Sequence, residues 1–152
     1  FLSILLNLFK SSFNDNFFHG PLIYYIYAPI YFISHNNPEA ISIFLRIFNA
    51  TGIFLVFFIG TILFNKRVGL LSALFFAFSF EQSQYSLFFG HPALAVIPVL
   101  SFYLGLSLVF FKKNTKGLIL AFGSLGFAIQ FHYVNSLLIL ILAAFLLFFE
   151  KR

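Results

Sequence analysis

The stretch ISIFLRIFNATGIFLVFFIGTILF, residues Ile41–Phe64, is an unusually long apolar run. A helix needs about 20 predominantly apolar residues, at about 1.5 Å each, to cross a hydrocarbon core about 30 Å thick. The run satisfies that requirement, and the polar triplet Asn65-Lys66-Arg67 follows it. This stretch therefore predicts a membrane-spanning helix.

The composition of the chain also indicates a membrane protein. Of its 152 residues, 61% are hydrophobic and 9% are charged, and the mean hydropathy is +1.00. Soluble domains carry about 25% charged residues. The net charge of +5 comes from short basic clusters between apolar runs, as membrane orientation requires. We therefore expect membrane lipids as partners, and no nucleic acid.

Four further apolar runs follow the first one along the chain. They are Val68–Phe80, Pro92–Phe111, Leu118–Phe131 and Tyr133–Phe149. We predict an all-α, polytopic transmembrane bundle with about five spans within residues 41–149, forming a single membrane domain over 1–152. Gly123 and Gly126 are expected to permit close approach between two helices.

Basic clusters predict the orientation. Lys66-Arg67, Lys112-Lys113-Lys116 and Lys151-Arg152 occupy every second connection, which places them on the cytoplasmic side. The connections 81–91 and 131–133 are then external, as is the start of the span at Ile41. All four histidines fall at the outer face, provided that the segment Pro21–Ser34 does not cross the membrane.

The segment Pro21–Ser34 is too short to span. Fourteen helical residues reach only about 21 Å, and Pro29 removes a backbone hydrogen bond from the middle of the segment. Its tyrosines suit the headgroup layer. We predict a kinked juxtamembrane or re-entrant helix within an external region 1–40.

Polar residues at the predicted outer face are candidates for a binding site. Arg46, inside a span, either reaches back to the headgroups or binds an anionic phosphate. Glu81, Tyr85 and His91 belong either to an interfacial loop or to a pocket wall, and the same alternatives hold for His132. The chain has no cysteine, no phosphate-binding loop and no zinc-type histidine spacing. No metal site or cofactor is predicted, and metal dependence stays open.

Several stretches, read in order, resemble the GT-C superfamily of membrane glycosyltransferases. HGPLIYYIYAPIYF (19–32) is similar to the His-Pro-Pro-Leu-Tyr-Tyr stretch of the dolichyl-phosphate-mannose protein mannosyltransferase-like, aminoarabinose transferase-like and Rgt-type enzymes. NPEAISIFLRIFNATGIF, LFNKRVGLLSALFFAFS, QYSLFFGHPAL and GSLGFAIQFHYVNSLLIL then follow in the family's order.

The resemblance implies transfer of a sugar from a polyprenyl-phosphate donor to a lipid, glycan or protein acceptor at the outer face. It implies an outer pocket lined by His19, Arg46, Glu81, Tyr85, His91 and His132. Two features depart from the pattern. The acidic pair that would supply the catalytic base is missing, so we expect it upstream in a longer protein, with this fragment inactive alone. Leu87 follows Tyr85-Ser86 where the family has Arg.

One alternative belongs to another functional class: a fragment of a secondary transporter or lipid flippase. It would require a polar track through the middle of the membrane, and it would often show broken helices in two corresponding halves. The polar residues of this sequence concentrate instead at the ends of the apolar runs.

Overall fold

The computed structural model describes residues 21–35, 37–80, 84 and 92–150. Each element of these ranges is a helix, and most coincide with the predicted apolar runs. In chain order they are α2 (Leu22–Ile33), α3 (Pro38–Ala50), α4 (Gly52–Leu63), α5 (Lys66–Ala77), α7 (Pro92–Lys112), α8 (Lys116–Phe131), the 3-10 helix η1 (Tyr133–Leu137) and α9 (Leu138–Glu150). The predicted all-α class is confirmed.

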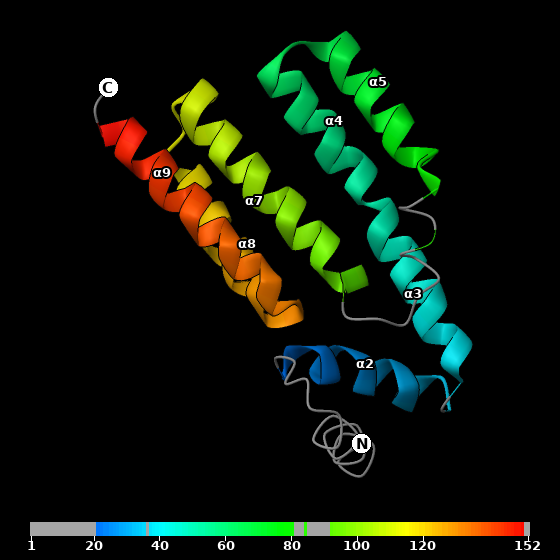
Figure 1. The fold of residues 1–152 in the computed structure, drawn as a ribbon. Helices are drawn as coiled ribbons and strands as arrows, with labels where there is room; N and C mark the ends of the chain where they lie inside the picture. The colour runs from blue at the N-terminus through cyan, green and yellow to red at the C-terminus, as the bar shows by residue number, and fades with distance from the viewer. Residues whose placement is uncertain (1–20, 36, 81–83, 85–91, 151–152) are drawn as a thin grey trace.

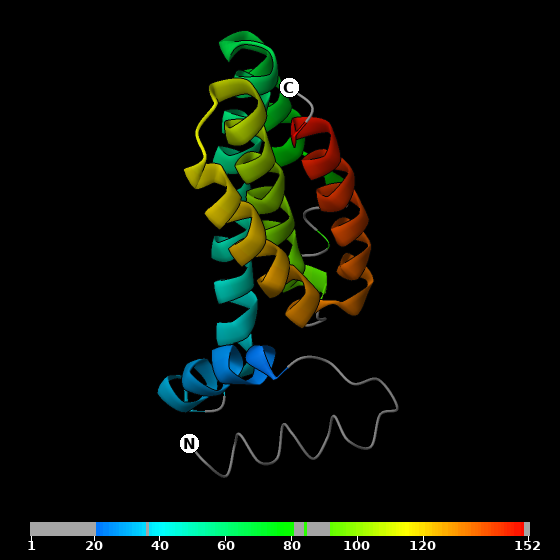
Figure 2. The ribbon, with the colours of Figure 1, turned by 90° about the vertical axis from the view of Figure 1, so that its left-hand side faces the viewer.

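The helices form an elongated bundle with one helix lying across its end (Figures 1 and 2). The segments α3–α4, α5, α7, α8 and α9 run along the bundle, whereas α2 lies across the end where α3 begins. Within the described ranges, two helices have the length and hydropathy of a membrane span, namely Pro38–Leu63 with 26 residues and Pro92–Lys112 with 21. The other apolar helices are shorter. This arrangement agrees with a helical membrane bundle that carries one short transverse helix.

The long N-terminal span is not one regular helix. The helix assignment breaks at Thr51, between α3 and α4. The Thr51 backbone N–H donates to Phe48 O at 3.2 Å, a bond to the residue three positions earlier, and the Thr51 hydroxyl donates to the same oxygen at 2.6 Å. Because bonds of this spacing tighten the last turn of a helix, the predicted continuous run over 41–64 is divided while its overall path is kept.

Asparagine side chains accept hydrogen bonds from backbone N–H groups at the start of three helices. Asn37 Oδ1 accepts a hydrogen bond from the Glu39 backbone N–H at 2.9 Å, next to Pro38 in the first turn of α3. Asn65 Oδ1 accepts from Arg67 and Val68 at the start of α5, at 3.0 and 3.1 Å. Asn114 Oδ1 accepts from the Lys116 N–H at 3.1 Å. These caps satisfy backbone donors that a helix start leaves unpaired, so each short connection ends at a defined residue.

Two pairs of glycines bring neighbouring helices into close contact. A Cβ added at Gly105 of α7 would lie 2.7 Å from Gly117 O of α8, and a Cβ at Gly60 of α4 would lie 2.9 Å from Gly69 Cα of α5. Backbones can approach this closely only where the side chain is absent. The predicted glycines are not the ones used: no described residue lies within 4 Å of a Cβ added at Gly123 or Gly126. That prediction is wrong because both of these glycines face outward.

Buried side chains form two clusters at different levels of the bundle. One joins α2, α3, α7 and α8 at the end where α2 lies, and its members include Ile23, Tyr24, Tyr27, Ile41, Leu45, Leu94 and Phe131. We call this end of the bundle the α2 end. The other joins α7, α8 and α9 through Phe102, Leu106, Ala121, Leu125, Leu138 and Leu142. The first cluster fixes the transverse helix against three other segments.

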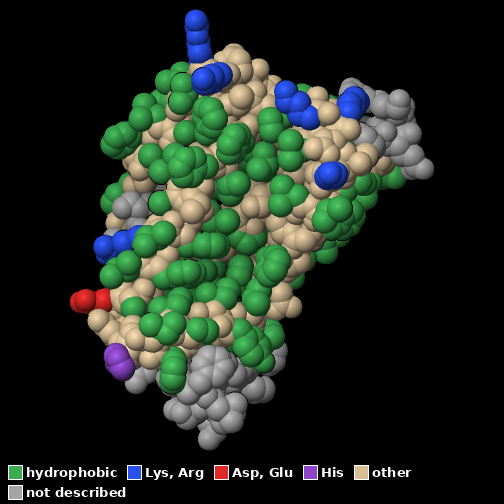
Figure 3. Space-filling view, turned by 180° about the vertical axis from the view of Figure 1, so that it is seen from behind, with side chains coloured by type: hydrophobic (Ala, Val, Ile, Leu, Met, Phe, Trp, Pro, Cys, Tyr) green, Lys and Arg blue, Asp and Glu red, His purple; other side chains and the backbone are tan. Residues whose placement is uncertain are grey.

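Basic side chains gather at the opposite end of the bundle (Figure 3). Of the described Lys and Arg residues, all except Arg46 flank the α4–α5 or the α7–α8 connection, and they are Lys66, Arg67, Lys112, Lys113 and Lys116. We call this the basic end. Figure 1 shows both connections at the end farthest from α2. The fold therefore separates a basic end from the α2 end along its long axis.

Candidate functional site at the α2 end

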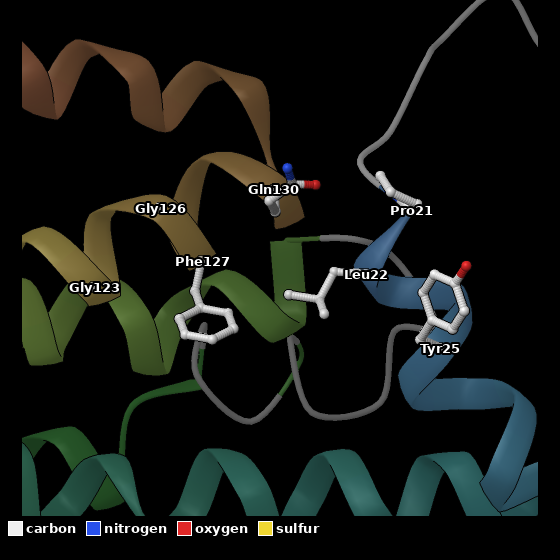
Figure 4. A pocket seen from close by; sticks show the side chains of 7 residues that line it. All are labelled: Pro21, Leu22, Tyr25, Gly123, Gly126, Phe127 and Gln130. Atoms are coloured by element: carbon white, nitrogen blue, oxygen red, sulfur yellow. The ribbon is translucent and has the colours of Figure 1, made fainter.

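An open groove lies between the start of α2 and the outward face of α8 (Figure 4). Its volume is about 500 Å³. The residues that line it are Pro21, Leu22 and Tyr25 on one side and Gly123, Gly126, Phe127 and Gln130 on the other. In Figure 4 the Leu22 side chain extends from α2 toward Phe127 of α8. The groove is thus shared by two segments that are about 100 residues apart in the chain.

The groove is mainly apolar, with polar groups contributed by two residues. Leu22 and Phe127 form its walls, and the two glycines leave the surface of α8 bare because they have no side chain. Tyr25 contributes a phenol and Gln130 an amide, and both residues are exposed. Few polar groups in a largely apolar recess are typical of a site that holds an apolar molecule in one orientation.

His132 lies at the C-terminal end of α8, two residues beyond Gln130. Its Nδ1 accepts a hydrogen bond from the Val134 N–H at 3.3 Å, so it caps η1. Its ring stacks on Tyr133, with ring centroids 5.5 Å apart. The side chain is half-buried. His132 therefore has a structural task at this end of the bundle, and it does not line the groove.

Arg46 lies on the exposed side of α3, next to the buried Leu45. Its guanidinium is accessible at the surface of the bundle, and it does not line the groove. Exposure agrees with both interpretations of this residue, an arginine that reaches the headgroups and one that meets a phosphate. Arg46 and His132 are the two predicted site residues that the structure describes, and no described contact joins them.

The other four predicted site residues, His19, Glu81, Tyr85 and His91, lie outside the described residues. Two of them adjoin described elements of the α2 end in the sequence. His19 comes two residues before Pro21, and His91 comes directly before Pro92, at which α7 begins. Helix α7, which begins at the residue after His91, and helix α8, which ends at the residue before His132, both contribute to the buried cluster of the α2 end.

The family model described as dolichyl-phosphate-mannose-protein mannosyltransferase matches residues 18–152. The chain belongs to this mannosyltransferase family. It is accordingly an integral membrane protein of a glycosyltransferase family, as the ordered resemblance of its stretches implied. No curated protein and no solved structure gave a match.

Three polar residues of this mannosyltransferase-family bundle are buried, namely Asn49, Ser107 and Ser124, and each donates a hydrogen bond within its own helix. The Asn49 amide donates to Leu45 O at 3.0 Å, the Ser107 hydroxyl donates to Tyr103 O at 2.8 Å, and the Ser124 hydroxyl donates to Leu120 O. The buried Thr61 hydroxyl of α4 has no hydrogen-bond partner among the described residues. No group of three or more His, Asp or Glu residues that could hold a metal ion occurs among the described residues.

Most residues of the groove were not singled out from the sequence. Gln130 lies two residues before the predicted site residue His132, but Leu22, Tyr25 and Phe127 gave no signal in so apolar a chain. The useful signal was Gly123 and Gly126, three residues apart on one helical face. That spacing leaves a bare strip, which a neighbouring helix fills in many membrane proteins and which here forms part of a groove.

Proposed function

We propose that this protein transfers a sugar from a polyprenyl-phosphate donor to the hydroxyl of a lipid, glycan or protein acceptor at the outer membrane face. The observation that carries the proposal is the groove between α2 and α8, in a chain that belongs to a mannosyltransferase family. Transfer of a hexose or a pentose is equally compatible with these features.

The groove suits the donor better than the acceptor. A polyprenyl chain is long and apolar, and it would contact Leu22, Phe127 and the bare strip at Gly123 and Gly126. The phosphate and the sugar would then lie where Gln130 can donate from its amide. Such a division, with an apolar recess and a few polar groups, supports binding of an amphipathic lipid donor.

The reaction needs groups that the groove alone does not contain. Attack of an acceptor hydroxyl on the anomeric carbon requires a general base, and the departing phosphate requires cations or fixed hydrogen-bond donors. We assign the base to a carboxylate upstream of this chain. His19, Arg46, Glu81, Tyr85, His91 and His132 are proposed to line the outer pocket, with Arg46 as the cation that neutralises the phosphate.

The buried polar residues favour this function over transport. A transporter requires polar groups near the midplane that face a substrate. Asn49, Ser107 and Ser124 instead donate to carbonyls of their own helices. These three buried donors are therefore used within their own helices, which supports sugar transfer over transport.

The experiment blocks the groove in the full-length protein. Gly126→Phe places a ring in the groove, and because the site is open it causes no clash with described residues. Ile119→Trp is the matched control, since it adds a ring at an exposed position of the same helix outside the groove. Both are reconstituted in proteoliposomes with polyprenyl-phosphate-linked mannose or pentose, and sugar transfer to acceptor is measured.

We expect Gly126→Phe to lower transfer by about tenfold or more, which corresponds to at least about 1.4 kcal/mol of lost donor binding, and Ile119→Trp to leave it unchanged. Equal rates in the two variants would show that the donor does not use this groove. Absence of transfer from either donor by the unaltered protein would reject glycosyl transfer itself.

A further inference from the structure

A second groove lies between α4, α7 and α9, away from the α2 end. Its volume is about 400 Å³. Its lining residues include Ile59 and Leu63 of α4, Tyr103, Phe110 and Phe111 of α7, and Phe145 of α9. Figure 1 shows α7 between α4 and α9. None of these residues lines the groove between α2 and α8, so the two sites are separate.

The groove follows the last turns of α7 toward the basic end. From Tyr103 to Phe111 the helix rises by about 12 Å. One leaflet of a hydrocarbon core about 30 Å thick is about 15 Å deep. The groove therefore matches the depth of one leaflet, and its lining side chains are almost all apolar.

Cations stand in the chain directly beyond the groove. Lys112 follows Phe111 at the end of α7, and Lys66 comes three residues after Leu63. Arg67, Lys113 and Lys116 complete the basic end defined above. An apolar groove with a cluster of positive charges beyond its end is complementary to a molecule with an apolar chain and an anionic headgroup.

The cations at the start of α5 and α8 lie at the positive ends of their own helix dipoles. Lys66 and Arg67 occupy the first turn of α5, and Lys116 occupies the first position of α8. The N-terminus of a helix carries partial positive charge, which disfavours a cation and attracts an anion. An anion at this end of the bundle would offset the repulsion between these cations and the helix N-termini, and it would itself be attracted by both.

We propose that the groove between α4, α7 and α9 binds an acidic phospholipid of the bilayer. One acyl chain lies along α7 from Phe111 to Tyr103, and the headgroup phosphate lies among the cations of the basic end, with Lys66 and Lys112 nearest to it. Charge complementarity selects this occupant over a zwitterionic lipid and over an apolar helix of another protein. The proposal does not depend on glycosyl transfer.

The experiment measures lipid affinity of the full-length protein in detergent by native mass spectrometry. The probes are palmitoyl-oleoyl-phosphatidylglycerol, the corresponding phosphatidylcholine, and inorganic phosphate as a competitor. The double variant Lys66→Gln/Lys112→Gln lowers the net charge by two, with Ile33→Glu/Asn37→Asp as a control that lowers it equally at exposed positions of the α2 end. Leu63→Trp narrows the groove, with Leu74→Trp as its control, because Leu74 is exposed on α5 outside the groove.

We expect the unaltered protein to prefer phosphatidylglycerol. A basic residue near an anionic lipid contributes about fivefold in affinity, so the double variant should bind it about 25-fold more weakly. Leu63→Trp should weaken it as well, and both controls should match the unaltered protein. Phe111→Ala, which removes an exposed part of the groove wall, tests the same point if Leu63→Trp does not fold.

Four outcomes would overturn the proposal. They are equal affinity for the two lipids, an equal loss in Ile33→Glu/Asn37→Asp, unchanged binding in both groove variants, and full displacement of the lipid by inorganic phosphate. The second would indicate a general effect of net charge. The third would indicate surface attraction without a groove, and the fourth a site for free anions.

Discussion

Replacement of Gly105 by alanine tests the close packing of α7 on α8. The added Cβ would lie 2.7 Å from Ala121 N and 2.7 Å from Gly117 O. Since carbon contacts are comfortable only near 3.5 Å, the α8 backbone must retreat by about 0.8 Å. Both clashing atoms belong to the backbone, so no side-chain rotation relieves them. Overpacking of this kind costs about 1–3 kcal/mol.

Gly126→Ala is the matched substitution, because Gly126 also lies within a helix but has open space around it. Each substitution gains about 1 kcal/mol of helix propensity. This gain cancels in the comparison, so Gly105→Ala should be less stable than Gly126→Ala by about 1–3 kcal/mol, the clash alone. Gly126→Ala itself should be more stable than the unaltered protein.

The free energy of unfolding is measured for both variants in mixed micelles, with helix content followed by circular dichroism. The reference is the unaltered full-length protein under the same conditions, which removes the contribution of the detergent. If Gly105→Ala proves as stable as Gly126→Ala, then α7 and α8 do not meet at this glycine and the described packing is wrong.

Two further predictions concern single hydrogen-bonding groups. The buried Tyr27 hydroxyl has no hydrogen-bond partner among the described residues; burial, and then Tyr31, raise the pKa of this phenol. Because Tyr27 ionises at a lower pH in the unfolded chain than in the folded protein, the folded state loses stability as the pH rises above about 10. Chemical unfolding of Tyr27→Phe should give an unchanged free energy of unfolding at pH 7 and a smaller loss than the unaltered protein between pH 9 and 11. A loss above about 1 kcal/mol at pH 7 would reveal a hydrogen-bond partner of the hydroxyl. Asn135→Ala removes the side-chain amide that donates to Ala128 O at 2.9 Å. Because the His132 N–H also donates to that oxygen, thermal unfolding should show a loss of stability of only about 0.5–1.5 kcal/mol. No loss would mean that the Asn135 side chain does not form this hydrogen bond.

The positions of the helices could be predicted because long apolar runs alternate with short polar connections. Asn65 and Asn114 stand at two of those connections and cap the following helices as their residue type favours. The contacts between helices could not be predicted. Gly105 and Gly126 look alike in a sequence whose helices are apolar on most faces, so no periodicity shows which of the two faces a neighbour.

The transverse position of α2 was predictable from its length and from Pro29, whereas its groove was not. The groove depends on where Leu22 meets Phe127, and contacts so distant in the chain leave no local pattern. Of the predicted pocket residues, Arg46 and His132 are described, and neither lines the groove. For the remaining four residues of that pocket, the assignment continues to rest on the resemblance to the family.

The Gly60–Gly69 contact has a consequence for biosynthesis. Helix α5 has 12 residues and a length of about 18 Å, too short to partition alone into a bilayer about 30 Å thick. It is joined to α4 by Phe64 and Asn65, and the glycine contact lies just beyond this turn on both sides. We therefore expect α4 to hold α5 back at the translocon until both can leave it as a hairpin, so that the unit inserted into the membrane is a pair of helices.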